Sequence, residues 1–401
     1  MSLPTPEEVQ ALVADLSTAA QAYSTAPDLE GYMSRVQLIA KARQLSRALI
    51  TPDQAPNYHG LNMAELIGIR SFMKHKVLDA IPSEGSISLE DLSKATGVQD
   101  SLLVAAGFLD QTRPDGGDYK HTKFSQAYIT ANPSPGHLFL AMYDEWFRNM
   151  HSFDEYLLKY GLHEPNDPLR NPYTRTHNQE GTPVWAIMAQ DPERIQAFQT
   201  GMAGIDVAIP VVGHFDFSTL KNTPEENEKG VVELVDVGGG HGVVLNKILT
   251  THPELTPKNC ALQDRPDVIE MAKANAVLPA DVQLVPHDFM TEQPIKGAKS
   301  YFMRMILHDY SDEVGIEILK NLAGAMSKDS RVLICEMVLP SRVGEADFAS
   351  AVLDQAVMTM GGKERTEDGF GKMLEAAGLQ LVNVWRVPGV PGACVEGRLK
   401  E

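Results

Sequence analysis

An apolar run that leads directly into four glycines constrains the fold of this chain more than any other feature. Residues 231–242 read Val-Val-Glu-Leu-Val-Asp-Val-Gly-Gly-Gly-His-Gly, and the run Val-Val-Leu-Asn-Lys-Ile-Leu follows with a helical pattern. Glycine lets a backbone turn tightly and approach a ligand where a Cβ would collide, and a helix N-terminus favours negative or polar ligand groups. We therefore predict a strand, a glycine loop and a helix that together bind a nucleotide-like ligand.

The spacing of these glycines distinguishes between two kinds of ligand. Dinucleotide-binding loops carry G-x-G-x-x-G, and the third glycine of that pattern would fall at Val243. Gly238, Gly240 and Gly242 instead give G-x-G-x-G, which is typical of proteins that bind S-adenosylmethionine. The spacing therefore favours S-adenosylmethionine over a nicotinamide dinucleotide.

Charge and cysteine usage exclude several classes of partner. The chain has 401 residues and a formal net charge of −18, which opposes binding to nucleic acid and to anionic membranes. Its three cysteines, Cys260, Cys335 and Cys394, are isolated in sequence, as expected for inert thiols in a reducing compartment. We find no signal peptide and no apolar stretch of membrane-spanning length, so we expect a cytoplasmic protein that binds small molecules and a second copy of itself.

The pattern of apolar residues divides the chain into three parts. Residues 1–130 are predicted to form amphipathic helices followed by a winged-helix dimerisation module. Residues 131–230 are expected to be a helical segment, rich in aromatic residues and methionine, that provides core contacts or a substrate wall and ends in a polar linker. Residues 231–401 alternate strands and helices, which predicts a doubly wound, mostly parallel sheet of the Rossmann-like α/β class.

The winged-helix interpretation rests on a short run of signals. Ser88 is expected to cap a helix that Gly97 ends, a second helix is expected from Asp100, and a hairpin is expected around residues 114–117. The presumed recognition helix, residues 100–110, contains no lysine or arginine. Because phosphate neutralisation supplies most non-specific DNA affinity, we expect a structural and dimerising role rather than DNA binding.

Polar residues follow the ends of several predicted strands. The strands are expected at residues 231–237, 259–263, 282–285, 300–307 and 332–338, with two more at 380–387 and 393–399 that form a hairpin with an antiparallel strand. Ligands of open α/β sheets bind outside the carboxyl ends of the strands. Asp236, Asp264, Asp288, His308 and Glu336 should therefore meet at one edge.

Histidine chemistry makes His308 the candidate general base. Its unperturbed pKa of about 6.5 lies nearest to working pH. Glu336, from the next predicted strand, is expected to hold the other ring nitrogen. Asp309 is too close in sequence to share a metal ion easily with His308, and no histidine cluster is evident, so we expect no catalytic metal.

Three motifs in order resemble a known enzyme family. They are Phe302-Met-Arg-Met-Ile-Leu-His-Asp-Tyr-Ser-Asp-Glu, Cys335-Glu-Met-Val-Leu-Pro and Met360-Gly-Gly-Lys-Glu-Arg-Thr-Glu. The chain resembles, over nearly its whole length, the plant caffeate-type and fungal secondary-metabolite O-methyltransferases, which are class I methyltransferases with an N-terminal winged-helix dimerisation domain.

The resemblance implies roles for individual residues. His308 would be the base, with Glu336 and Glu364 as the carboxylates flanking it. The cofactor, S-adenosylmethionine, would be bound by the following residues: Asp236, Gly238, Gly240, Asp264, Arg265, Asp288, Phe289 and Arg304. The chain departs from the family pattern at His241, where a small residue is usual, and at Leu102–Thr112, which lack the usual arginine-rich helix.

The reaction itself has two interpretations. The favoured one is methyl transfer to a hydroxyl, a phenol or an enol, of an aromatic, polyketide or pyridone-type secondary metabolite. The alternative is a dehydration or pericyclic rearrangement in which the cofactor is bound but not consumed, as in some fungal proteins that resemble the family. Retention of His308, Glu336 and Glu364 favours methyl transfer, because a cyclase has no need of that base.

Overall fold

A computed structural model describes residues 3–99, 108–113, 116–130, 135–202, 209–344, 347–388 and 390–400. The chain divides into two compact units, residues 1–147 with 188–204 and residues 148–187 with 205–401. The segment 131–230, predicted as one part, contributes to both of them. Within the described ranges, every helix is too short or too polar to cross a membrane.

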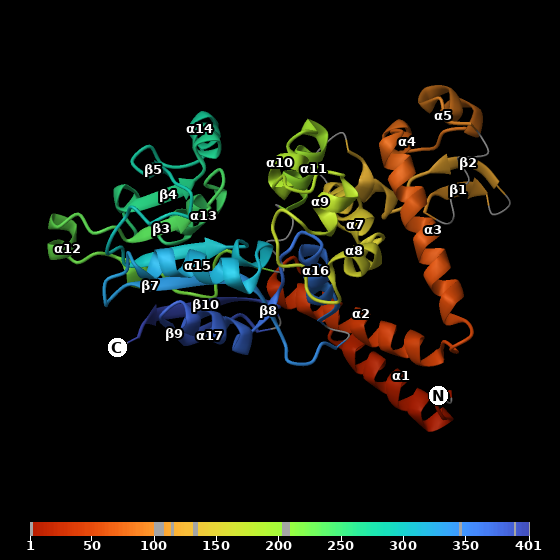
Figure 1. Ribbon diagram of the computed structural model, residues 1–401. Helices are drawn as coiled ribbons and strands as arrows, with labels where there is room; N and C mark the ends of the chain where they lie inside the picture. The colour runs from red at the N-terminus through yellow and green to blue at the C-terminus, as the bar shows by residue number, and fades with distance from the viewer. Residues whose placement is uncertain are drawn as a thin grey trace. The chain divides into compact units, whose positions relative to one another are not determined.

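The second unit is built on one mixed sheet (Figure 1). Its strands run in the order β5-β4-β3-β6-β7-β10-β9, and β8 pairs with β7. All neighbours are parallel except β10, which is antiparallel to both β7 and β9. The bounds are β3 Leu234–Val237, β4 Cys260–Asp264, β5 Gln283–Pro286, β6 Ser300–Arg304, β7 Arg331–Leu339, β8 Arg365–Thr366, β9 Leu379–Arg386 and β10 Gly392–Leu399.

The order of strands places a crevice beside β3. The chain passes from β3 outward to β4 and β5 and then returns to the other side of β3 as β6. The loops after β3 and β6 therefore diverge to opposite faces, and ligands of doubly wound sheets bind at such a switch point. Both loops carry predicted site residues, Gly238 and His308.

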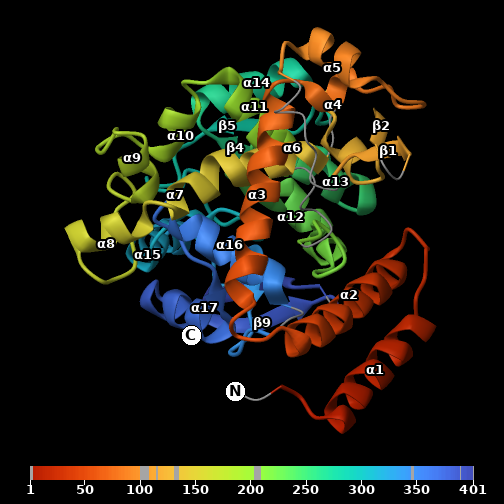
Figure 2. The ribbon, with the colours of Figure 1, turned by 90° about the vertical axis from the view of Figure 1, so that its right-hand side faces the viewer.

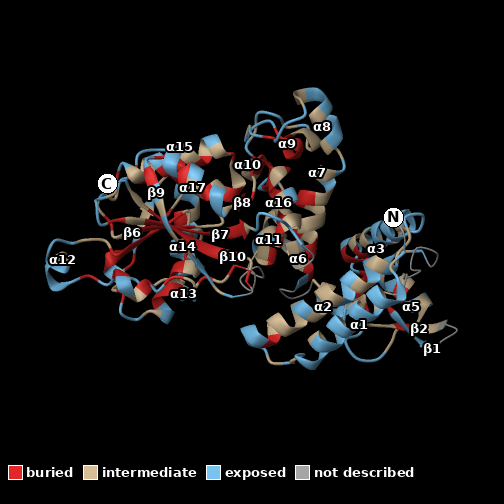
Figure 3. Ribbon diagram, turned by 90° about the horizontal axis from the view of Figure 1, so that it is seen from below, coloured by how far each residue is buried: buried red, intermediate tan, exposed pale blue. Residues whose placement is uncertain are grey.

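Helices cover both faces of this sheet. Figure 3 shows the buried strands between α15 (Asp312–Ala323) and α17 (Glu367–Ala376) on one side and α13 (Val243–Thr251) and α14 (Pro266–Asn275) on the other. Alternate residues of β7, among them Val332 and Ile334, pack with Leu319 of α15 and Phe370 of α17 in one buried cluster. This alternation between the two faces follows from the two-residue period of a strand.

The predicted strands and the glycine-to-helix transition are confirmed, with one informative difference. The strand expected at residues 300–307 ends at Arg304, because Met305 adopts a left-handed backbone conformation with φ of 54°. Ile306 precedes a single helical turn, η7 (Leu307–Asp309). His308 thus lies on a buried turn beyond the strand and not within the strand's last residues.

The first unit is mainly helical. The pair α1 (Pro6–Gln21) and α2 (Leu29–Leu49) lies side by side in Figures 1 and 2, joined by an ion pair of 2.8 Å between Lys41 Nζ and Asp15 Oδ2. The other elements of this unit are α3 (Ala55–Lys74), α4 (Val77–Ala80), α5 (Leu89–Thr96), β1 (Asp110–Arg113), β2 (Gly116–Lys120), η2 (Ser125–Tyr128), α6 (Pro135–Ala141), the π-helical η3 (Met142–Phe147) and α11 (Pro192–Met202).

Several signals of the winged-helix prediction are present in this unit. The Ser88 side chain caps α5, Gly97 ends that helix with φ of 70°, and β1 and β2 form an antiparallel hairpin. The helix expected from Asp100 falls mainly on residues 100–107, which lie outside the described residues. The winged-helix module itself stays a prediction.

The aromatic segment is largely core. Phe139 and Trp146 of the first unit and Tyr156 of the second are buried, as expected for side chains that pack inside each unit. The remaining helical segments are α7 (Arg148–Met150), α8 (Phe153–Tyr160), α9 (Pro172–Thr176), α10 (Val184–Met188), η5 (Phe217–Leu220), α12 (Pro224–Glu228), η6 (Pro257–Asn259) and α16 (Phe348–Met358).

Candidate functional site

The glycine loop after β3 has the geometry that its sequence predicts. Gly238, Gly240 and Gly242 have φ values of 71°, 59° and 82°, a region that side chains with a Cβ rarely adopt. A Cβ on Gly238 would lie 2.8 Å from Ile306 Cδ1, and one on Gly239 would collide with the carboxylate of Asp236. Gly242 is the N-cap residue of α13, and no side chain of the described residues caps this helix, so the loop brings amides without a partner inside the helix to the end of the sheet.

A cavity of about 280 Å³ lies at the carboxyl ends of the strands, within the second unit. It is lined by residues at or beyond the carboxyl ends of β3, β4, β5 and β6, together with one residue of α10: Gly238, Asp264, Arg265, His287, Asp288, Phe289, Met290, Ile306, Asp309, Tyr310 and Trp185. Five of the eight residues predicted to bind the cofactor, Gly238, Asp264, Arg265, Asp288 and Phe289, therefore line one cavity.

The Asp264 carboxylate organises the mouth of this cavity. Its Oδ2 accepts a hydrogen bond of 2.8 Å from the Gly240 amide, and its Oδ1 accepts one of 2.8 Å from the Arg265 amide. The carboxylate therefore ties the end of β4 to the glycine loop of β3. An acidic side chain at this place is suited to accept hydrogen bonds from ribose hydroxyls.

The remaining predicted cofactor residues do not line the cavity. Asp236 is buried against the glycine loop at Gly239. Its Oδ2 has no hydrogen-bond partner among the described residues. Burial, with a smaller contribution from the charge of Asp264, raises the pKa of Asp236 to about 7. Arg304 Nη2 donates to the Ile209 carbonyl at 2.7 Å, and His241 is half-buried in the loop.

His308 and Glu364 form the buried side-chain pair of the candidate catalytic cluster. The His308 Nδ1 lies 2.8 Å from Glu364 Oε1, and both side chains are almost fully buried. His308 follows β6 and Glu364 precedes β8, which pairs with the carboxyl end of β7. A carboxylate acceptor on Nδ1 places the proton on that nitrogen, which leaves Nε2 with a lone pair in the neutral ring.

Glu336 does not hold the imidazole ring, which corrects the expectation from the sequence. Its Oε1 accepts hydrogen bonds from three consecutive amides, those of Ile306, Leu307 and His308, at 3.1, 2.6 and 3.3 Å. The left-handed Met305 turns the chain so that these amides point at one carboxylate oxygen. Glu336 therefore fixes the backbone of the turn, while Glu364 orients the ring.

The sequence did not place Asp309 in this cluster. Its Oδ1 lies 3.6 Å from His308 Nε2, it lines the cofactor cavity, and burial raises its pKa to about 6. Burial alone would lower the pKa of His308, but the carboxylates of Asp309 and Glu364 outweigh that effect and raise it to about 10. The signal in the sequence for this role of Asp309 is its adjacency to His308.

Metal ligation finds no support in this geometry. Throughout the part of the chain that the structure describes, no three His, Cys, Asp or Glu side chains lie together in an arrangement that could hold a metal ion.

The three cysteines are buried, and burial raises the pKa of Cys260 to about 12, which keeps its thiol protonated and inert.

Comparison with known proteins assigns the family. The family model described as an O-methyltransferase domain matches residues 157–380. The methyltransferase cfoD of Aspergillus candidus is 35% identical over 92% of this chain and 93% of its own length. This chain belongs to the O-methyltransferase family.

Solved structures agree with this assignment. The structure of OxaC in complex with S-adenosylhomocysteine and oxaline covers 98% of this chain and 99% of its own, with 26% identity and a TM-score of 0.83. A structure described as a pericyclic reaction enzyme covers 99% of this chain and 100% of its own at 22% identity and a TM-score of 0.77, which shows the shared fold alone. The protein is thus an O-methyltransferase whose cofactor is S-adenosylmethionine, and it resembles fungal secondary-metabolite methyltransferases.

The residues of the cavity fit this cofactor. Asp264 offers a carboxylate for ribose hydroxyls, and the rings of Phe289, Tyr310 and Trp185 offer apolar faces for a purine. A Cβ on Gly238 would crowd Ile306, which lines the same cavity, so glycine at this position keeps the backbone open to close approach by the cofactor. Trp185 belongs to the aromatic segment that the sequence offers as core or as a substrate wall, and nothing in its local pattern assigns it to the cofactor cavity.

Proposed function

We propose that this methyltransferase acts on a hydroxyl, a phenol or an enol, of an aromatic, polyketide or pyridone-type secondary metabolite, with His308 as general base. The single observation that carries the proposal is the buried His308–Glu364 pair of 2.8 Å beside the cofactor cavity. The relatives whose names indicate methyl transfer and the complex with oxaline support the substrate class.

In the proposed mechanism, His308 Nε2 is the atom that accepts the proton of the substrate hydroxyl. Bound S-adenosylmethionine supplies an electrophilic methyl group. His308 Nε2 takes the proton of the acceptor hydroxyl as its oxygen becomes a nucleophile, and Glu364 stabilises the resulting imidazolium through Nδ1. Glu336 keeps the turn rigid, so that Nε2 remains in one position during the transfer.

The pKa of His308 bears on the strength of this base. An unperturbed phenol has a pKa of about 10, and a histidine of pKa about 10 accepts its proton with almost no thermodynamic penalty. At neutral pH, however, most of the imidazole is already protonated. The rate of methyl transfer to a phenol should therefore rise with pH until His308 is neutral.

The decisive experiment measures product stoichiometry. The protein is incubated with methyl-labelled cofactor and a panel of phenolic and pyridone acceptors, and S-adenosylhomocysteine is quantified together with the methylated product. We expect one equivalent of each, and His308→Ala should lower kcat by roughly 10² to 10⁴ for a phenol. Turnover of an acceptor without stoichiometric S-adenosylhomocysteine would reject methyl transfer as the reaction.

One observation favours a second candidate, a pericyclic or dehydration reaction with the cofactor unconsumed. The carboxylates around His308 raise its pKa to about 10, so a protonated His308 would be a buried hydrogen-bond donor at neutral pH. Such a donor, with the sulfonium charge of the cofactor, stabilises developing negative charge on a carbonyl oxygen. The same assay separates the two candidates, because rearranged product would accumulate while the labelled cofactor stayed intact.

We further propose that the protein is a cytoplasmic homodimer formed through its N-terminal helices. Apolar side chains stand exposed along α2 and α3, including Ile39 at 53%, Met63 at 62% and Ile67 at 54%. Exposed apolar faces of this kind mark interaction surfaces. The three buried free thiols suit a reducing compartment.

A further inference from the structure

Arg365 is a buried charge that the proposed mechanism does not use. We propose that Arg365 is a positioning residue that clamps the turn carrying His308 and Asp309 to the segment carrying Glu364. This inference rests on the proposed role of His308 as base. Arg365 would set the distance between His308 and Glu364 without contacting the reacting atoms of either side chain.

The guanidinium of Arg365 binds both ends of the catalytic turn. Its Nη1 donates to the Leu307 carbonyl at 2.9 Å, and its Nη2 donates to the Tyr310 carbonyl at 2.8 Å. These carbonyls flank His308 and Asp309 on either side in sequence. A second contact of Nη1, 3.2 Å to the Lys363 carbonyl, ties the same group to the backbone beside Glu364.

Backbone contacts beside Arg365 bring the two segments still closer. The Lys363 amide donates to the His308 carbonyl at 2.9 Å, and Gly362 packs so tightly on the turn that a Cβ there would collide with the same carbonyl. The Glu364 amide itself donates to Asp354 Oδ1 at 2.9 Å. The Glu364 side chain therefore reaches His308 from a backbone that is held at Lys363 and at Glu364 itself.

The hydrogen bonds of the turn are shared between two neighbouring segments. Glu336 binds its amides, while Arg365 and the Lys363 amide bind its carbonyls. A buried turn with unpaired carbonyls would be costly, and a guanidinium is the side chain whose planar fork can reach several of them at once. Lysine carries the same charge but offers no such fork.

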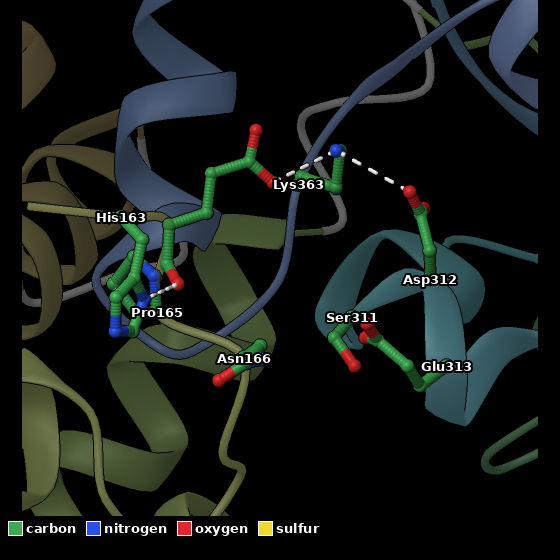
Figure 4. A pocket seen from close by; sticks show the side chains of 8 residues that line it. His163, Pro165, Asn166, Ser311, Asp312, Glu313 and Lys363 are labelled. Carbon is green, nitrogen blue, oxygen red and sulfur yellow. Dashed lines mark hydrogen bonds and ion pairs between the residues drawn. The ribbon is translucent and has the colours of Figure 1, made fainter.

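Asp312 completes the clamp near the protein surface. Arg365 Nε donates to Asp312 Oδ1 at 2.8 Å, where the arginine side chain is 2% exposed and the aspartate 49%. Asp312 Oδ2 also lies 3.4 Å from Lys363 Nζ, which forms a second ion pair of 2.8 Å with Glu164. Figure 4 shows these contacts of Lys363 in a surface pocket beside the first turn of α15.

The test compares Arg365→Lys with Arg386→Lys. Arg386 is a matched control, because it is a half-exposed arginine of the same unit whose partner, Glu367 at 3.1 Å, lies outside the site. We expect Arg365→Lys to lower kcat about 10- to 100-fold, since small displacements of aligned groups have effects of this size. The KM for the cofactor and the dissociation constant of S-adenosylhomocysteine should change less than about twofold.

A second measurement reports the pKa of the His308 imidazole directly. The pKa of His308 is measured by NMR on histidine-labelled protein in the absence of acceptor, and its signal is assigned among the 12 histidines by its loss in His308→Gln. If Arg365→Lys moves Glu364 away from the ring, the pKa of His308 falls, because Glu364 is one of the groups that raise it. A structural loss elsewhere would leave this pKa where it is.

The outcomes separate the two proposals. An unchanged His308 pKa together with an unchanged kcat in Arg365→Lys would overturn the positioning role. A lowered pKa in a protein that transfers no methyl group would support the positioning role and reject the proposed reaction. If Arg365→Lys does not fold, Asp312→Asn weakens the same clamp from its exposed end. The pKa of His308 must then fall as well, by a smaller amount.

Discussion

At the scale of residues, the candidate site consists of one buried imidazole among three carboxylates, of which Glu336 and Glu364 are buried and Asp309 is partly exposed. Glu364 contacts Nδ1, Asp309 lies near Nε2, and Glu336 binds the backbone beneath the ring. Burial raises the pKa of Glu336 and of Asp309, while the carboxylates together raise that of His308. The raised pKa of His308 stabilises the folded protein below about pH 6.5, and this contribution is lost as the pH rises towards about 10.

Glu364→Gln should move the pH dependence of methyl transfer. The substitution keeps an acceptor for Nδ1 but removes a negative charge that favours the imidazolium, so the pKa of His308 falls by about one unit or more. The rising limb of kcat/KM then moves to lower pH, while the plateau falls because the imidazolium is less stabilised. The measurement is kcat/KM from pH 6 to 10 with a weakly acidic phenol.

Glu292→Gln is the control for this experiment. Glu292 is exposed and pairs with Lys296 on the surface of the same unit. Its pH profile should match that of the unsubstituted protein. A Glu364→Gln profile that also coincides with it would contradict the assignment of the rising limb to His308.

At the scale of elements, the glycine loop between β3 and α13 is defined by steric requirements. Gly242 has φ of 82°, and a Cβ there would lie 2.5 Å from Leu278 Cδ1. Gly378, in the turn between α17 and β9, has the same φ of 82° but no atom within 4 Å of such a Cβ. The two positions therefore separate backbone strain from steric collision.

Gly242→Ala should destabilise the protein more than Gly378→Ala. Both variants carry the cost of a left-handed alanine, about 1 to 2 kcal/mol, and Gly242→Ala adds overpacking against Leu278 of about 1 to 3 kcal/mol. Urea unfolding gives the two free energies, and titration with S-adenosylhomocysteine should show weaker binding for Gly242→Ala alone. Equal losses of stability and unchanged binding in both would show that the collision is relieved by Leu278 without consequence.

At the scale of the whole molecule, the cofactor cavity and the proposed dimer interface belong to different units. Every residue that lines the cofactor cavity lies in the second unit, and the exposed apolar residues of α2 and α3 lie in the first. If the proposed dimer forms through α2 and α3, substitutions on these helices should change the oligomeric state and leave cofactor binding intact.

The double variant Met63→Glu, Ile67→Glu should convert a dimer into monomers. The two residues are one turn apart on α3, glutamate maintains the helix, and burial of two carboxylates in an apolar interface would weaken association by at least about 100-fold. Light scattering gives the mass, and the control is Leu158→Glu, Leu162→Glu, which changes side chains 82% and 87% exposed in the other unit. A dimer that persists in the α3 variant would place the interface elsewhere.

Local patterns in the sequence determined the elements and their kind. The apolar runs at residues 231–237 and 332–338, the glycine spacing and the alternation of strands with helices gave the doubly wound sheet and the cofactor loop, because these signals depend on neighbours in the chain. The motifs around His308, Glu336 and Glu364 likewise identified the candidate catalytic residues by number.

Only the tertiary structure determined which carboxylate orients the His308 ring and which binds the backbone of the turn. Glu364 lies 56 positions from His308 and Glu336 lies 28, and only the pairing of β8 with β7 and the left-handed turn at Met305 bring the first to the ring and the second to the backbone. The same packing added Asp309 and Arg365 to the cluster and Trp185 to the cavity. Hydrogen bonds and charge interactions between distant segments depend on ångström-scale distances, and such distances are set by packing and leave no periodic signal in the sequence.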